Sequence, residues 1–156
     1  MHIRLLAVGD RQPSWVDTAF AEYTARLPRQ WKFRLDTIAT ADRRKAVTPE
    51  RAKDLEAVKL LGKLQPAEQV VLLDENGRQF TSRELSSRID GWQASGDNLA
   101  FIIGGPDGVS DDVRKRANLT WSMSSLTLPH GLARVLFAEQ LYRAWSLTTG
   151  HPYHRD

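Results

Sequence analysis

The chain has 156 residues and no cysteine, with 41% hydrophobic residues, 26% charged residues and a formal net charge of +3. This composition is typical of one globular domain with its own core, and the lack of cysteine excludes a disulfide scaffold, a cysteine nucleophile and thiolate metal ligands. The net charge is smaller than that of a dedicated nucleic-acid binder. The apolar run at residues 3–8 is too short for a signal peptide or a membrane span, so we expect a cytoplasmic protein with no membrane partner.

Strand and helix patterns alternate along the chain. Nearly unbroken apolar runs predict buried strands at residues 3–8, 69–73 and 99–103, and a last short strand is predicted at residues 119–123. Apolar and polar residues alternate from Trp31 to Asp36, which predicts an edge strand. Helical spacing of apolar residues predicts helices at residues 14–27, 48–64, 81–92, 110–117 and 129–145. The alternation predicts one α/β domain over residues 1–156, with a mostly parallel sheet and helices on both faces.

Hydroxyl residues at the predicted helix starts are candidate caps, namely Ser14, Thr48, Thr81, Ser110 and Thr127. Asp17 follows Ser14, and Glu84 follows Thr81, at the spacing of a capping box. Residues 39–47 are polar and basic and predict a loop, and residues 74–77 predict a turn.

The predicted helix at 129–145 differs from the others because its apolar residues cover most of its circumference. They are Leu132, Val135, Leu136, Phe137, Leu141, Tyr142 and Trp145. Such a helix must be buried on more than one side. Two arrangements remain open: a central helix in a monomer, or a helix that packs on its own sheet and on a second subunit. Glu139 and Arg143 have the spacing of an ion pair on this helix.

Three loops follow predicted strands at the carboxyl edge of the sheet, where open α/β sheets bind ligands. They begin at Leu73, at Gly104 and at Met123. The Gly104–Gly108 loop contains three glycines, which indicate either close approach of a ligand to the backbone or a tight turn. It matches neither the dinucleotide-binding nor the P-loop pattern.

Other polar clusters are less informative. Basic clusters at residues 26–34, 43–45 and 114–116 indicate either solvated faces or anion-binding patches. The four histidines have no acidic partners at ligand spacing, so we expect no metal. The tail at residues 151–155 is rich in donors and acceptors and is either frayed or held by the preceding helix. His130 is a candidate for helix capping or for supporting a site.

Three segments resemble the RlmH group of the SPOUT methyltransferase superfamily. They are residues 101–108 (FIIGGPDG), residues 126–145 and the tail at 151–155 (HPYHR). The resemblance covers essentially the whole chain. It implies a carboxyl-terminal trefoil knot, an exception to the rule that chains stay unknotted, and a homodimer.

The resemblance also implies a function. The enzyme would transfer a methyl group from S-adenosylmethionine to N3 of a pseudouridine in 23S large-subunit ribosomal RNA, with the assembled ribosome as its substrate. The implied methyl-donor contacts are Leu73, Gly104, Met123, Ser124, Ser125, Leu126, Thr127 and Leu128. Gly105 and Gly108 are added from their place in the same loop.

The tail supplies the candidate catalytic residues. His154 is the candidate base for the N3 proton, because the ordinary pKa of histidine lies nearest neutral pH. Arg155 could hold RNA phosphate or a developing anion, and Tyr153 could stack on the base. Arg143 is a candidate RNA or interface residue. Two alternatives remain open: a SPOUT enzyme that acts on transfer RNA, and a non-catalytic RNA-binding dimer associated with the ribosome.

Overall fold

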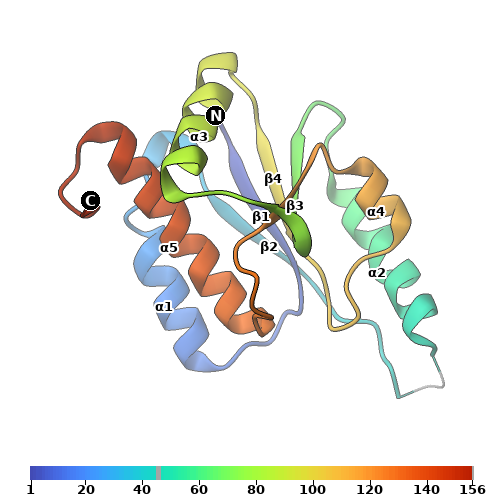
Figure 1. The fold of residues 1–156 in the computed structure, drawn as a ribbon. Coiled ribbons are helices and arrows are strands. Elements are labelled where there is room, and N and C mark those ends of the chain that lie inside the picture. Colours follow the sequence, from blue (N-terminus) through green and yellow to red (C-terminus); the bar gives the residue numbers. More distant parts are fainter. Residues whose placement is uncertain (45–46, 156) are drawn as a thin grey trace.

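The computed structural model describes residues 1–44 and 47–155, and their strands form one five-stranded sheet (Figure 1). The strands are β1 (Ile3–Val8), β2 (Arg34–Ile38), β3 (Gln69–Gln79), β4 (Leu99–Ile103) and β5 (Leu119–Ser122). Every pair is parallel, in the order β2-β1-β4-β3-β5. The helices are α1 (Ser14–Thr24), α2 (Pro49–Lys63), α3 (Ser82–Ser95), α4 (Asp111–Arg116) and α5 (His130–Thr149). The predicted parallel α/β architecture is confirmed.

The sheet separates two apolar cores, because successive side chains of a strand point to opposite faces. On one face, Leu5 and Phe101 pack with residues of α1, α3 and α5. On the other face, Leu6 and Ile102 pack with residues of α2 and with Val113 of α4. Figure 1 shows α1, α3 and α5 to the left of the sheet and α2 and α4 to its right. Helices on both faces are therefore confirmed.

Two predicted strand boundaries are wrong. Trp31 belongs to a 3₁₀ turn, Arg29–Trp31, and its indole nitrogen donates a 3.0 Å hydrogen bond to Gln93, so the edge strand starts only at Arg34. The predicted turn at 74–77 is part of β3, which continues to Gln79 across a shift in register between Leu73 and Arg78. The alternation and the turn residues are local signals, and tertiary pairing overrides both.

The predicted caps are only partly right. Thr48 caps α2, and Thr81 forms a capping box with Glu84 at α3, as expected. The predictions for Ser14 and Thr127 are wrong, because Pro13 and Pro129 occupy the N-cap positions of α1 and α5. Ser110 is at the N-cap of α4, but its hydroxyl forms no capping bond. Lys45, in a predicted basic cluster and loop, lies outside the described residues.

Helix α5 lies between α1 and α3 against the sheet (Figure 1). Phe137, Leu141 and Tyr142 are buried in this arrangement, so packing within one chain accounts for much of the apolar circumference. Leu132 remains 46% exposed, and Leu136, one turn later, is half-buried. The apolar surface that is left over is therefore a strip near the amino end of α5. Among the described helices, none is long and apolar enough to cross a membrane.

Candidate active site

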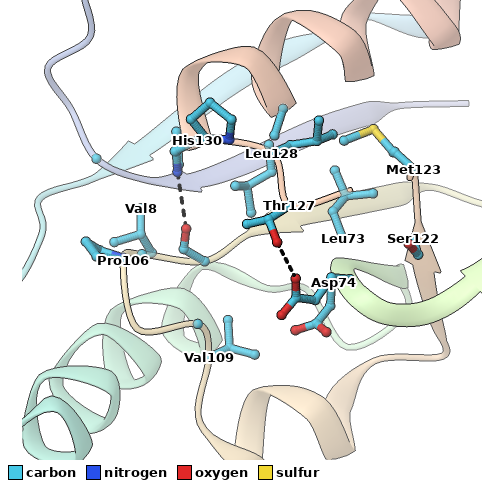
Figure 2. Close-up of a pocket in the computed structure, with 18 of the residues that line it drawn as sticks. Val8, Leu73, Asp74, Pro106, Val109, Ser122, Met123, Thr127, Leu128 and His130 are labelled. Carbon is cyan, nitrogen blue, oxygen red and sulfur yellow. Dashed lines mark hydrogen bonds between the residues drawn. The ribbon is translucent and has the colours of Figure 1, made fainter. Parts of the chain in front are cut away.

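A cavity of about 580 Å³ opens at the carboxyl edge of the sheet. The loops that follow β1, β3, β4 and β5 form its walls, together with the first turn of α5 (Figure 2). The predicted ligand residues that line it are Leu73, Gly104, Gly105, Gly108, Met123, Ser124, Leu126, Thr127 and Leu128, with His130 beside them. Ser125 lies in the same loop, but its side chain is exposed and is not part of the lining.

The cavity also has walls that the sequence patterns did not single out. Gly9, Arg11 and Gln12 come from the loop after β1, and Thr40 follows β2. The sequence did contain a signal for the wall after β1. Gly9 directly follows a buried strand, so it lies at the same edge of the sheet as the other loops. Nothing in the sequence marks Thr40, whose position depends on how the polar segment after β2 folds.

The glycines in the loop after β4 are required by the fold itself. A Cβ on Gly104 would lie 2.6 Å from Val109 Cγ1, and one on Gly105 would lie 2.7 Å from the buried carboxylate of Glu56. Gly108 has a φ of +81° and closes a turn through its N–H bond to the Gly105 carbonyl at 3.0 Å. The tight-turn interpretation is therefore right, and the turn itself forms one wall of the cavity.

His130 and Arg134 fix the loops around the cavity at the amino end of α5. Arg134 is 2% exposed, and its Nη2 donates to the Gly9 carbonyl at 2.8 Å and to His130 Nε2 at 3.0 Å. Because a guanidinium only donates, Nε2 must accept, and Nδ1–H donates to the Gly104 carbonyl at 3.2 Å (Figure 2). Burial and the Arg134 charge lower the pKa of His130. The imidazole is therefore neutral and supports the cavity wall.

Two carboxylates line the cavity on the β3 side. Asp74 accepts a 2.8 Å bond from Arg114 and a 2.9 Å bond from the Asn76 N–H. Burial alone would raise the pKa of Asp74, but these two partners outweigh burial and lower it. Glu75 accepts a 3.3 Å bond from the Thr127 hydroxyl, which ties the β3 wall to the loop before α5 (Figure 2). Because Asp74 is paired with Arg114, Glu75 is the carboxylate on this side that suits a ligand with positive charge.

The tail folds back on the carboxyl half of α5. The Tyr153 hydroxyl donates to Glu139 at 3.0 Å, and Arg143 donates to the same carboxylate at 2.6 Å while its guanidinium lies 5.1 Å from the Tyr153 ring centre. Burial and hydrogen bonds to Tyr23 and Glu139 raise the pKa of Tyr153, so its hydroxyl stays protonated. His154 is half-buried. The tail is therefore held rather than frayed.

The structure does not bring the tail to the cavity of its own chain. The cavity is at the amino end of α5 and the tail at its carboxyl end (Figure 1). Tyr153 reaches back only to Glu139, nine residues after His130 on α5, and at 1.5 Å per residue about 14 Å of helix still separates the two. Tyr153, His154 and Arg155 do not line the cavity of their own chain. Among the described residues, no group of three or more His, Asp or Glu side chains could hold a metal ion.

The chain is similar to known methyltransferases along its whole length. Residues 1–154 match the family model described as "Predicted SPOUT methyltransferase". The ribosomal RNA large subunit methyltransferase H of Thioalkalivibrio sulfidiphilus is 49% identical over 156 residues, and that of Hahella chejuensis is 45% identical over 156 residues; both alignments cover 100% of each chain.

Solved structures agree on the fold. A probable methylase family protein from Haemophilus influenzae superposes with a TM-score of 0.57 at 10% identity, over 99% of this chain and 70% of that one. A probable methyltransferase from Bordetella pertussis superposes with a TM-score of 0.54 at 14% identity, over 91% of this chain and 95% of that one. On its sequence and its fold, the chain belongs to the RlmH group of the SPOUT methyltransferase family.

Proposed function

We propose that this protein uses S-adenosylmethionine to methylate N3 of a pseudouridine in 23S large-subunit ribosomal RNA, within the assembled ribosome. The observation that carries the proposal is the cavity at the carboxyl edge of the sheet, formed by the loops that the family resemblance assigns to the methyl donor. The names of the full-length relatives add the substrate class, large-subunit ribosomal RNA.

The residues of the cavity fit this methyl donor. A volume of about 580 Å³ lies within the usual range for small-molecule sites. Leu73, Met123 and Leu128 offer apolar surface to a flat adenine ring, and Glu75 suits the positive charge of the donor. S-adenosylmethionine, when bound, supplies a methyl group on a cationic sulfur.

The chain's own residues must then position the base and remove its N3 proton. Positioning supplies most of the rate in a transfer between two bound reactants. His154 accepts the proton; its Nδ1 is buried and has no partner among the described residues. Arg155 is exposed and stabilises the anionic pyrimidine oxygen, while Tyr153 stacks on the base.

The separation of tail and cavity implies that these residues act in trans. In a two-fold dimer in which the two α5 helices run in opposite directions, the tail of each subunit lies beside the cavity of the other. The exposed Leu132 and half-buried Leu136 give that interface an apolar strip next to the cavity. A trefoil knot formed by the cavity loops is part of the same proposal. The dimer also has twice the net positive charge of one chain, which by itself is small.

Mass spectrometry of RNA from a strain that lacks the gene tests the function. We expect one methylated pseudouridine to disappear from 23S RNA while transfer RNA is unchanged. Loss from transfer RNA would identify a transfer-RNA enzyme instead. Calorimetry with S-adenosylmethionine separates both enzymes from a non-catalytic module, which would not bind it.

Single substitutions test the catalytic assignments. His154→Ala should lower turnover on isolated large subunits by at least about 100-fold, the usual contribution of a positioned base, and leave donor binding unchanged. Full activity of this variant would rule out the base role. Arg155→Ala should lower turnover or affinity for the subunit.

Mixed dimers test whether the tail acts in trans. One partner carries His154→Ala and the other carries Thr127→Trp, which places a large ring at the exposed rim of the donor cavity and blocks it. Random exchange of the two inactive proteins should restore roughly a quarter of the wild-type activity, because half of the dimers are mixed and each has one complete site. If the mixture stays inactive, each tail serves its own subunit.

A further inference from the structure

A second hollow lies between the end of β3 and the first turns of α3. Its volume is about 360 Å³, and it shares no residue with the methyl-donor cavity. The residues that line it, called here the arginine groove, are Arg78, Phe80, Arg83, Glu84, Ser87 and Arg88.

Two of the arginines form cation–π contacts with the same aromatic ring, that of Phe80. The guanidinium carbons of Arg78 and Arg88 lie 5.2 Å and 4.5 Å from the centre of the Phe80 ring. That ring is itself fixed, because it packs at 6.4 Å against Trp121, which is 4% exposed. Cation–π contacts of this kind restrict a flexible side chain without neutralising its charge. The two guanidiniums are therefore preorganised.

The groove is strongly positive. Arg83 adds an exposed third guanidinium from the first turn of α3. The one carboxylate, Glu84, accepts a 2.8 Å bond from the Thr81 N–H in the capping box, and this bond lowers the pKa of Glu84. Glu84 is thus committed to the helix start, and the arginines outnumber it.

We propose that the arginine groove binds phosphates of the RNA substrate next to the target nucleotide. The inference rests on the proposed function, which makes RNA the substrate. Guanidinium groups bind phosphate through paired N–H donors, and fixed ones lose less entropy when they bind. A protein partner is less suited to this surface, because the Phe80 ring is already covered by two guanidiniums and the core of a protein interface is depleted in charge.

The groove lies beside the wall of the methyl-donor cavity. In the β3–β5 ladder Arg78 pairs with Trp121, and Gln79 pairs with Ser122; Trp121 and Ser122 also line the cavity. Glu75 of the cavity and Arg78 of the groove are three residues apart on β3, a span of about 10 Å. An RNA strand whose target base entered the cavity would have its neighbouring phosphates within reach of the groove.

A double variant and a matched control test this assignment. Arg78→Gln/Arg83→Gln removes two exposed charges from the groove. Arg51→Gln/Lys59→Gln removes two exposed charges from α2, on the opposite face of the sheet. Both proteins keep the same net charge as each other. Arg78→Lys/Arg83→Lys retains the charge but not the fork of donors.

Three measurements on the full-length protein compare the variants. They are methylation kinetics on large ribosomal subunits from the deletion strain, binding of a short single-stranded RNA at several salt concentrations, and calorimetry with S-adenosylmethionine. The groove variant should raise KM for subunits at least about tenfold with kcat and donor affinity unchanged. Its log K for RNA should fall less steeply with log salt, by about 1.4 for two lost phosphate contacts. The lysine variant should recover part of the affinity.

The outcomes that overturn the proposal are specific. An unchanged KM, or an equal loss in the α2 control, would show that the groove does not bind the substrate. A loss on ribosomal subunits without any loss on single-stranded RNA would identify a ribosomal protein as the partner instead. If the proposed function itself is wrong, the wild-type protein will neither bind the donor nor methylate subunits. In that case the difference in RNA binding between the groove variant and the α2 control still shows whether the groove binds phosphate.

Discussion

The two ends of α5 are held in different ways. At the amino end, the buried Arg134 and the half-buried His130 bond to backbone carbonyls of the loops after β1 and β4. The tail that follows the carboxyl end is held from the middle of the helix, where Glu139 bonds to the partly exposed side chains of Arg143 and Tyr153.

This difference matters because buried and exposed polar contacts have different strengths. A buried donor or acceptor that loses its partner costs the full desolvation of that group, whereas an exposed ion pair contributes little. The cavity end of α5 is therefore held more firmly than the tail, whose contacts with Glu139 are partly exposed. The proposed contact of one subunit's tail with the partner's cavity would use this difference.

The largest expected loss of stability is that of Arg134→Ala, and Arg143→Ala on the same helix is the comparison. Arg134→Ala leaves the Gly9 carbonyl and His130 Nε2 without their donor and opens a void, so unfolding free energy should fall by about 3 kcal/mol. Arg143→Ala removes a 31%-exposed partner of Glu139 and should cost at most about 1 kcal/mol. Urea denaturation measures both. Equal losses would show that the two ends are held equally firmly.

A smaller effect is expected when the tail is released. Glu139→Ala removes the acceptor of both Arg143 and Tyr153, and should cost about 1 kcal/mol of stability. Amide hydrogen exchange should speed up at residues 150–155 and stay unchanged at residues 104–108. The matched control is Glu22→Ala, which breaks the exposed Glu22–Arg26 pair on α1. Faster exchange throughout the protein would contradict a local tether.

The fold could largely be predicted from the sequence, because the strong signals are periodic and local. The nearly unbroken apolar run of β1, the apolar run of β4 and the Thr81–Glu84 box appear in the structure where expected. Apart from the caps predicted at Ser14 and Thr127, the errors are at Trp31 and at residues 74–77, where a side-chain bond to Gln93 and pairing with β5 decide the backbone. Contacts between residues this far apart in the sequence leave no local pattern.

The candidate site was less predictable. The loops at the strand ends could be located, since parallel strands bring their carboxyl ends to one edge. The role of Arg134 could not be predicted, because an arginine among the apolar residues of a helix normally indicates a solvated position, and only the folded chain brings the Gly9 carbonyl to it. The arginine groove was missed for a related reason. Its three arginines are five residues apart in the sequence, so they form no basic run.

The smallest expected effect concerns pH and the amino end of α5. Burial and the Arg134 charge lower the pKa of His130 below its ordinary 6.5. Below that pH the unfolded chain binds a proton that the folded chain resists, so stability falls as pH decreases and is fully restored above 6.5.

His130→Gln keeps an amide that can hydrogen-bond but does not titrate. Its stability should decline less than that of the wild type between about pH 8 and pH 5, by a margin smaller than the loss in Arg134→Ala. Urea midpoints across this range measure the difference, with His2→Gln, at an exposed position, as the control. If His130→Gln and the wild type decline in parallel, His130 is not held neutral by Arg134. The contrast between the two ends of α5 would then rest on Arg134 alone.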